Sequence, residues 1–227
     1  MLMKGMGEII SASKDTGWVL EPEAKRLFSM AGMDTPRFTW AKKLEEAVQF
    51  ADKMGYPVVA KVVSPKIIHK SEVKGVIVGI DGKDGLRDAF ERFSRMDGFA
   101  GMLVEERVSG IEVFVGGKVD EQFGPVVLFD MGGTGVEIYK DVTLRMAPLR
   151  PGDVQSMIRC LKARPLLEGF RGDAPVNLMA LETLLGTFSE LLMTLETEIE
   201  SIDLNPVMCS STRCVVADAR IMLKKNL

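Results

Sequence analysis

The only histidine of this 227-residue chain, His69, lies in a polar and cationic segment. Lys70 follows it directly, and segment 64–75 holds three lysines and ends at Gly75. An imidazole is a competent nucleophile toward phosphorus, and a flexible cationic loop suits the binding of a nucleoside triphosphate. We therefore take Lys70 and Gly75 as candidate nucleotide contacts. A loop histidine is also often an ordinary surface residue, so the pattern alone leaves both interpretations open.

A second candidate is Lys61, which interrupts the apolar run Tyr56-Pro-Val-Val-Ala-Lys61-Val-Val63. Such a run is typical of a buried strand, and a buried ammonium group needs an anionic partner. That partner is either a protein carboxylate in a salt bridge or the phosphate of a ligand. An edge position in the sheet would also explain the lysine.

Oxygen ligands for a metal come from two C-terminal segments. Asn205 lies in Ser201-Ile-Asp203-Leu-Asn205-Pro206, and Asp218 follows thirteen residues later. Two neighbouring strands would place the two side chains next to each other. An amide oxygen, a carboxylate and phosphate oxygens together make a hard, mostly hydrated Mg²⁺ site. An Asx turn at Pro206 explains Asn205 equally well.

Composition excludes several classes of protein. One histidine cannot supply a site that needs two or more imidazoles from this chain. The formal net charge of −3 gives no overall basic field for nucleic acid or an anionic membrane. No run of 18 or more apolar residues occurs, so neither a membrane span nor a membrane partner is expected.

The three cysteines are odd in number and lack the spacing of a zinc knuckle. Cys209 and Cys214 could meet across a short hairpin, while Cys160 lies far from both in the sequence. A reduced, cytoplasmic protein is the simpler prediction.

The elements that must position these residues alternate between helices and strands. Apolar periodicity predicts helices over 21–31, 44–54, 86–96, 154–161 and 181–195. Strands are predicted over 56–63, 73–80, 102–106, 111–115, 125–131, 136–141, 198–204 and 214–219. The mixture and the short connections indicate an α+β fold. We divide the chain into an N-terminal arm (1–20) and two subdomains, 21–100 and 101–227.

Several short motifs in a fixed order resemble one known family. They are Gly55-Tyr-Pro-Val-Val-Ala-Lys61, Ser64-Pro with His69-Lys70-Ser71, Phe123-Gly-Pro-Val-Val, Gly132-Gly with Val136-Glu137, and Asp203-Leu-Asn205-Pro206 with Asp218-Ala219. The set resembles the ATP-grasp domain of NDP-forming acyl-CoA synthetases. It is most similar to the separate β subunit of archaeal-type ADP-forming acetyl-CoA synthetase, a relative of succinyl-CoA synthetase β. Neither a Walker A nor a G-x-G-x-x-G turn occurs.

The resemblance implies an ATP-grasp fold, in which two α/β subdomains share a nucleotide cleft. It also implies the reaction acyl-CoA + ADP + phosphate ⇌ acid + CoA + ATP, with Mg²⁺ and ATP or ADP bound by this chain. The partner would be a CoA-binding α subunit in a hetero-oligomer, which forms an acyl phosphate and carries the first phosphohistidine.

The resemblance further assigns roles to single residues. Lys61 and, more loosely, Lys25 match lysines near the nucleotide phosphates. The segment from Glu105 to Val108 matches a hinge that receives the adenine, and Glu112 lies near the ribose. Metal ligands and catalytic residues are also matched: Asn205 and Asp218 for Mg²⁺, His69 as a second phosphoryl relay, and Asp203 as the acid that orients a phosphohistidine.

Three positions depart from the family pattern, namely Asp130, Thr134 and Asn177. Two other functions remain as alternatives. One is an ATP-grasp carboxylate ligase of another specificity, which the length of 227 residues argues against. The other is a nucleotide-binding regulatory module without turnover, which the joint presence of Lys61, His69, Asn205 and Asp218 argues against.

Overall fold

The computed structural model describes residues 4–133, 141–150 and 152–224. The chain divides into two compact units. Unit 1 consists of residues 1–35 and 109–227, and unit 2 of residues 36–108. Each unit has its own sheet and its own hydrophobic core.

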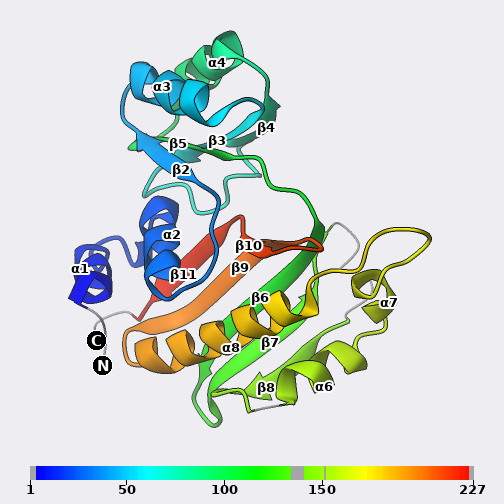
Figure 1. Cartoon of the computed structure of the whole chain (residues 1–227). Coiled ribbons are helices and arrows are strands. Elements are labelled where there is room, and N and C mark those ends of the chain that lie inside the picture. Colours follow the sequence, from blue (N-terminus) through cyan, green and yellow to red (C-terminus); the bar gives the residue numbers. More distant parts are fainter. Residues whose placement is uncertain (1–3, 134–140, 151, 225–227) are drawn as a thin grey trace. The chain divides into compact units, whose positions relative to one another are not determined.

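Unit 2 is built on a four-stranded antiparallel sheet in the order β2-β5-β3-β4. The strands are β2 (Phe38–Ala41), β3 (Val58–Val63), β4 (Val76–Ile80) and β5 (Gly101–Glu106). Helices α3 (Leu44–Met54) and α4 (Lys83–Ser94) cover one face of this sheet (Figure 1). All six residues of β3 are buried, as the apolar run around Lys61 predicts.

Unit 1 is built on a seven-stranded antiparallel sheet in the order β1-β11-β9-β6-β7-β8, with β10 paired to β9. Its strands are β1 (Trp18–Val19), β6 (Ile111–Asp120), β7 (Gly124–Met131), β8 (Thr143–Met146), β9 (Ile199–Cys209), β10 (Cys214–Val216) and β11 (Ala219–Leu223). The long strand β9 lies between β6 and β11 and also pairs with the short β10.

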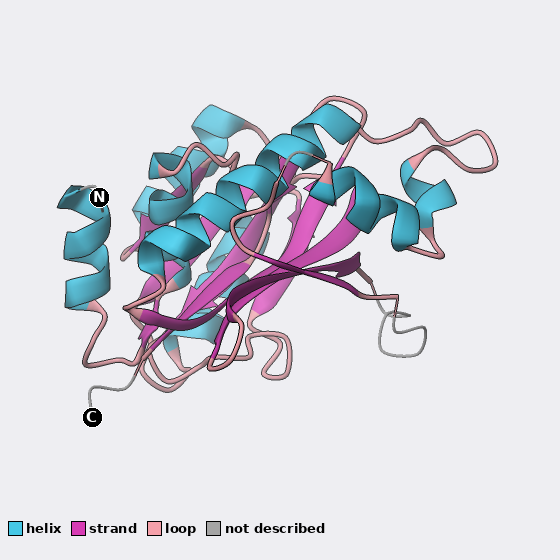
Figure 2. Ribbon diagram, turned by 90° about the horizontal axis from the view of Figure 1, so that it is seen from below, coloured by secondary structure: helices cyan, strands magenta, loops and turns pink. Residues whose placement is uncertain are grey.

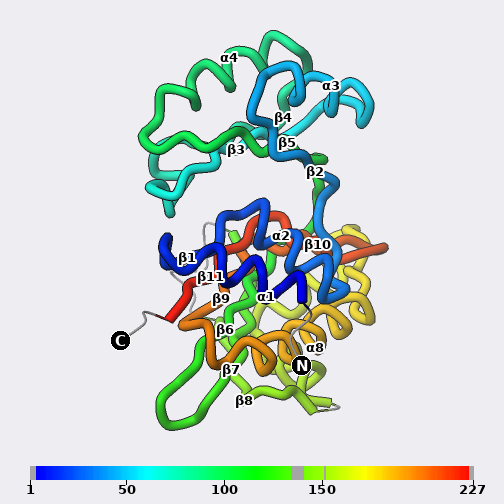
Figure 3. Tube along the Cα trace, turned by 90° about the vertical axis from the view of Figure 1, so that its left-hand side faces the viewer, coloured from blue at the N-terminus to red at the C-terminus, as the bar shows by residue number. Residues whose placement is uncertain are grey.

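In the described part of unit 1, this sheet is accompanied by the helices α1 (Lys4–Ala12), α2 (Glu21–Met30), α6 (Asp153–Cys160), α7 (Arg164–Leu167) and α8 (Leu178–Leu195). Helix α8 runs across one face of the sheet (Figure 2). Helix α1 packs on α2, and α2 packs on β11 (Figure 3).

Side-chain alternation separates the two faces of the sheet in unit 1. Ile202 and Leu204 of β9 are fully buried, whereas Asp203 between them is only half-buried. The buried set faces α8, because a Cβ placed on the register partner of Ile202, Gly117 in β6, would meet Phe188 and Leu192 of α8. Asp203 therefore lies on the face opposite α8.

By length and composition alone, α8 is the one described helix that could cross a membrane, with a mean hydropathy of 1.4 over 18 residues. Its apolar residues at helical spacing, including Leu181, Leu185, Phe188 and Leu192, are fully buried in the core of unit 1. A core helix passes the same test of length and hydropathy. The packing accounts for the apolar stripe of α8 without a membrane.

The α+β fold class is confirmed, but the predicted boundaries at residues 20 and 100 are wrong. Residues before 20 are no arm, because α1 and β1 pack as part of unit 1. Helix α2 also joins unit 1, and β5 joins unit 2 because it pairs with both β2 and β3. Strand pairing over long sequence distances, which local periodicity does not report, determines these boundaries.

Two predicted strands also differ from the structure. The strand predicted to end at 204 continues to Cys209, with a register shift opposite Val113 and Val115 that accommodates Asn205 and Pro206 as a bulge. The strand predicted over 214–219 is two strands, β10 and β11, which pair with different parts of β9. Most of the strand predicted over 136–141 lies outside the described residues.

We expect Gly117→Val to lower the free energy of unfolding by about 1–3 kcal/mol, because the new side chain enters the space that Phe188 and Leu192 occupy. Gly186→Ala is the matched control, since a Cβ at this position in α8 meets nothing within 4 Å. Removing a helical glycine there should raise stability by up to about 1 kcal/mol. Urea unfolding followed by circular dichroism measures both changes, and equal stabilities would contradict the packing of α8 on β6.

Candidate functional site

The predicted lysine of unit 2 has a carboxylate partner. Lys61 Nζ lies 2.8 Å from Glu105 Oε1, and the two side chains are only 6% and 3% exposed. Glu105 is the register partner of Val59, so the two charges sit diagonally across β3 and β5, on one side of the sheet. The salt-bridge interpretation of Lys61 is therefore correct as far as it goes. Glu105, the partner of the buried Lys61 ammonium group, is itself a predicted nucleotide contact.

The predicted hinge coincides with the boundary between the units. Strand β5 ends at Glu106, and unit 2 ends at the half-buried Val108. Before the chain leaves the unit, Arg37 holds Glu106 by its guanidinium, with Nε 3.1 Å from Oε2, and the Glu106 amide donates to the Arg37 carbonyl. Glu105 and Val108 thus belong to the segment through which the chain leaves unit 2 and re-enters unit 1.

The loop that carries His69 is anchored at both ends. At its start, Ser64 Oγ donates to the carbonyl of Asp97 at 2.7 Å. At its end, the amide of Val62 in β3 donates to the carbonyl of Gly75, and the Gly75 amide donates to the carbonyl of Lys70. Between these anchors His69 is exposed. The structure therefore presents the imidazole to solvent on a loop fixed to the strand of Lys61.

Gly75 has a structural role that the sequence reasoning did not include. A Cβ at this position would lie 2.5 Å from Cγ1 of Val62 and 3.0 Å from the carbonyl oxygen of Lys70. The glycine thus permits the tight closure of the loop onto β3. Whether it also contacts a nucleotide stays a prediction, as does the contact predicted for the half-buried Lys70.

In unit 1, Lys25 is completely buried on α2. Its Nζ lies 3.0 Å from Oε1 of Glu21, one helical turn earlier, whose side chain is 4% exposed. A buried helical ion pair is uncommon, because desolvation of both charges is costly. The pattern of α2 did not predict this burial.

Asp203 is held by a residue that sequence reasoning did not assign. Arg220 is its register partner on β11, and the guanidinium contacts Oδ2 through Nη2 at 2.6 Å and Nε at 3.2 Å. Both side chains are partly exposed on the face opposite α8. Arg220 lies two residues after Asp218, so the signal was present in the same motif.

The predicted metal ligands are neighbours, as expected from adjacent strands. The backbone amide of Asn205 donates to the carbonyl of Asp218 at 3.0 Å. Asn205 is exposed and lies at the bulge of β9, a feature that often redirects a side chain near an active site. The oxygen-bearing side chains of two such neighbouring residues fit a hydrated Mg²⁺ ion that takes its other ligands from water and phosphates. Among the described residues, no group of three or more His, Cys, Asp or Glu side chains could hold a metal.

Glu112, the predicted ribose contact, lies at the start of β6 beside the glycines that follow β7. Its carbonyl accepts the amide of Gly132 at 2.7 Å, and a Cβ on Gly132 would lie 2.7 Å from the Glu112 carbonyl carbon. Gly132 is thus required for this close approach. The following residues of the loop, 134–140, lie outside the described part of the chain.

Asp130 precedes this loop and is buried. Its Oδ1 has no hydrogen-bond partner in the described structure. Burial, with a smaller contribution from the Asp141 carboxylate, raises the pKa of Asp130 above its ordinary value, against a hydrogen bond from the Met131 amide. Asp141 itself accepts the amides of Lys162 and Ala163. The residue that departs from the family pattern at position 130 is therefore a buried carboxyl group whose charged form is poorly solvated.

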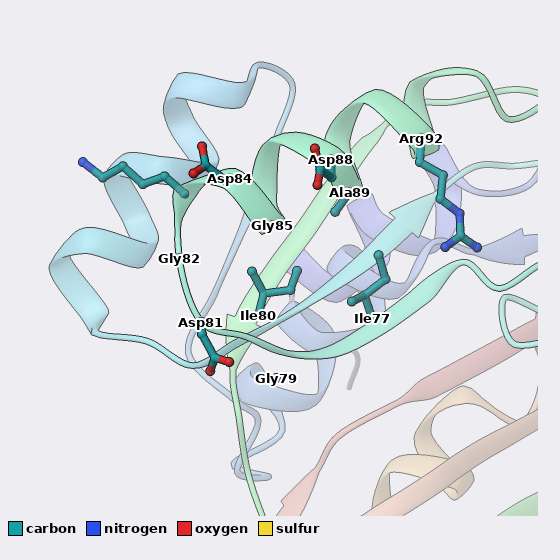
Figure 4. A pocket seen from close by; sticks show the side chains of 11 residues that line it. Ile77, Gly79, Ile80, Asp81, Gly82, Asp84, Gly85, Asp88, Ala89 and Arg92 are labelled. Carbon is teal, nitrogen blue, oxygen red and sulfur yellow. The ribbon is translucent and has the colours of Figure 1, made fainter.

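A cavity of about 590 Å³ in unit 2 contains none of the predicted site residues. It lies between β4 and the first turns of α4, and Asp81, Asp84 and Asp88 are among the residues that line it (Figure 4). In unit 2 the predicted residues Lys61 and Glu105 lie near the His69 loop. In unit 1 the predicted residues lie on β9 and next to β11, with Glu112 on β6 and Lys25 on α2.

The ATP-grasp domain model matches residues 11–223. The chain is 40% identical over 225 residues to the β subunit of acetate–CoA ligase (ADP-forming) I of Pyrococcus furiosus, covering 95% of this chain and 97% of the relative. The chain belongs to the ATP-grasp family of ADP-forming acetate–CoA ligase β subunits.

Two further relatives extend this assignment. Acetate–CoA ligase (ADP-forming) I of Archaeoglobus fulgidus is 37% identical over 97% of this chain, which spans only 33% of that relative. A structure of dinucleotide-forming acetyl-coenzyme A synthetase 1 of Ca. Korarchaeum cryptofilum aligns with a TM-score of 0.84 at 37% identity, covering 96% of this chain and 100% of that one. That structure is described as a complex with coenzyme A and Mg-AMPPCP, with a phosphohistidine segment pointing towards the nucleotide-binding site.

The buried pair of unit 2 can be tested for a role beyond stability. Lys61→Met should lower the free energy of unfolding by about 3–5 kcal/mol, because it leaves the Glu105 carboxylate buried without this cation. Lys61→Met/Glu105→Leu should recover most of that loss, since an apolar pair can replace a buried ion pair. Neither variant should bind Mg-ATP in titration calorimetry. Nucleotide affinity that returns together with stability would show a purely structural lysine.

Proposed function

We propose that this chain is the nucleotide-binding β subunit of an ADP-forming acyl-CoA synthetase that transfers phosphoryl groups through His69. The observation that carries the proposal is the placement of an exposed imidazole on a loop fixed to β3, the strand that bears Lys61. Family membership supplies the reaction: acyl-CoA + ADP + phosphate ⇌ acid + CoA + ATP.

The relay consists of two phosphoryl transfers, the first from nitrogen to nitrogen and the second from nitrogen to oxygen. In the direction of ATP synthesis, the P–N bond of a phosphohistidine on the α subunit breaks, and a P–N bond to an imidazole nitrogen of His69 forms. That bond then breaks as a terminal phosphate oxygen of ADP attacks, which yields ATP and regenerates the imidazole. A covalent carrier on a loop protects the phosphoryl group from water during transport.

Charged residues around the loop support this chemistry. Phosphoryl transfer proceeds through a loose transition state whose charge is spread over the phosphoryl oxygens, so nearby cations stabilise it. Lys70 is placed next to His69 by the sequence, and the ammonium group of Lys61 is held at a defined position by Glu105. In this proposal Lys61 and Lys25 bind the phosphates of the nucleotide, and the segment from Glu105 to Val108 binds the adenine.

In unit 1, we propose that Asn205 and Asp218 hold Mg²⁺ and that Asp203 orients a phosphohistidine. Bound Mg²⁺ would neutralise charge on the phosphates of the nucleotide. The Asp203 carboxylate is fixed by Arg220, which gives it one orientation on the sheet. Glu112, beside Gly132 and Gly133, is proposed to bind the ribose hydroxyls.

The partner in this proposal is a CoA-binding α subunit. The Pyrococcus furiosus relative is named as a β subunit, and the Archaeoglobus fulgidus relative is about three times as long as the matched region. This relation is expected when one reaction is divided between two chains in some members and fused in others. The acid, the CoA and the first phosphohistidine are assigned to that partner.

His69→Ala should abolish acyl-CoA formation by the reconstituted α–β complex while Mg-ATP still binds, because the side chain is exposed and outside the core. The direct readout is an acid-labile phosphate after incubation with Mg-ATP, detected by mass spectrometry on the peptide that contains the only histidine of the chain. Ser94→Ala, an exposed change on α4, is the control and should keep both properties. Full activity of His69→Ala refutes the relay.

Asp218→Ala should weaken the binding of Mg-ATP by about tenfold or more, because a charged oxygen ligand is lost. Raising the Mg²⁺ concentration should recover part of the affinity, which distinguishes lost metal binding from general damage. Asp120→Ala is the matched control. Asp120 is an acid of the same sheet that accepts the amides of Gln122 and Phe123 instead. An unchanged Mg²⁺ dependence in Asp218→Ala contradicts the metal assignment.

A further inference from the structure

Cys209 and Cys214 face each other across the β9–β10 hairpin. They are register partners, and the hairpin is closed by the amide of Ser210, which donates to the carbonyl of Arg213 at 2.9 Å. Because hydrogen-bonded and non-hydrogen-bonded pairs alternate in antiparallel strands, the cysteines form a non-hydrogen-bonded pair. The amide of Val216, two residues further, accordingly donates to Asp34 and not to β9.

This type of pair brings the side chains of opposite residues closest together. Cα atoms of a non-hydrogen-bonded pair lie about 4.5 Å apart. A disulfide requires a Cα separation of roughly 4.4–6.8 Å. The general separation for such a pair falls at the lower limit of that range, so the register of the hairpin permits a bond between Cys209 and Cys214.

The two thiols differ in access. Cys209 is 1% exposed and Cys214 4% exposed. Cys214, however, lines a cavity of about 340 Å³, whose rim residues Met179 and Thr212 are exposed. Cys209 is not among the residues that line it. A small molecule in the cavity can therefore meet Cys214 first, with Cys209 next to it.

The two thiols also differ in acidity. A hydrogen bond with Cys209 lowers the pKa of Cys214, against the opposing effects of burial and the Asp34 carboxylate. The same hydrogen bond and burial raise the pKa of Cys209. Arg213 pairs with the same Asp34 carboxylate at 3.5 Å. Cys214 is thus the better nucleophile, because the thiolate is the reactive form.

We propose that Cys209 and Cys214 form a thiol–disulfide modification site that reacts with small-molecule disulfides entering the cavity beside α8. The Cys214 thiolate attacks one sulfur of the disulfide, the S–S bond of the small molecule breaks, and one thiolate leaves and takes up a proton. Cys209 then attacks the Cys214 sulfur of the mixed disulfide. A Cys209–Cys214 bond forms, and the second small thiol leaves with the proton of Cys209. The cysteines are oxidised by two electrons, and the disulfide is reduced to two thiols.

The site is distinct from the proposed nucleotide chemistry. None of the residues assigned to the nucleotide, Mg²⁺ or phosphoryl transfer lines this cavity. Cys160, the third cysteine, is exposed and belongs to α6 and not to the hairpin. It has no resolving thiol on the same hairpin, so it serves as an internal comparison.

The test uses the folded full-length chain carrying Cys160→Ser, treated with 2-hydroxyethyl disulfide and then denatured for thiol counting. The expected result is the loss of both remaining thiols without a retained adduct, and a cross-linked peptide that contains Cys209 and Cys214 in mass spectrometry. Reduction with dithiothreitol should return both thiols. Two free thiols after treatment, or two separate adducts, would overturn the proposal.

The order of attack gives a second test. Cys160→Ser/Cys209→Ser should retain a stable adduct on Cys214, because no resolving thiol is present. Cys160→Ser/Cys214→Ser should stay unmodified, because Cys209 does not line the cavity. Equal modification of the two variants contradicts the assigned roles. Circular dichroism checks their folding, and if a buried serine prevents folding, the thiol count of Cys160→Ser decides alone.

Discussion

The alternation of side chains along β9 divides the seven-stranded sheet into a face that α8 covers and a face that carries charge. Ile202 and Leu204 point into the core below α8, so Asp203 between them must point the other way. Strand β9 pairs with β6, β10 and β11. Because register partners lie on the same face, the buried and exposed faces of these strands follow those of β9. The pairing of Arg220 with Asp203 follows from the same constraint, because register partners share a face.

The bulge at Asn205 and Pro206 interrupts the alternation at one point. It takes up an extra residue on β9 relative to β6, after which Val207 and Cys209 return to the buried face. Proline lacks the amide that a regular ladder would use, and a bulge is one of the few places where a central strand tolerates it. The consequence is an exposed Asn205 next to Asp218, with the core on either side kept intact. The positions of the proposed metal ligands therefore depend on this bulge, and the residues on both sides of it, Leu204 and Val207, stay fully buried.

Unit 2 shows the complementary arrangement, in which a charge is buried and paired. Lys61 lies in a strand whose residues are all buried, and Glu105 neutralises it from the adjacent strand. A cation fixed in this way needs little reorganisation when a phosphate approaches, which favours transition-state stabilisation. The His69 loop is joined to the same strand through Gly75, so a rigid strand supports an exposed loop. An exposed histidine on a loop that is fixed to a buried strand is the physical basis of the proposed relay.

Apolar periodicity determined most elements, because burial of one face imposes a repeat that the residues display directly. It also predicted that Lys61 requires an anion and that Asn205 and Asp218 could meet. It did not predict the domain boundaries, the extension of β9 or the helix α1. The reason is that the positions of β5, β9 and β11 in their sheets are determined by pairing with strands that are distant in the sequence. Local composition does not show which residues of two such strands pair. Tertiary structure alone decided that the anion beside Lys61 is Glu105, that Arg220 holds Asp203, and that Cys214 borders a cavity while Cys209 lies behind it.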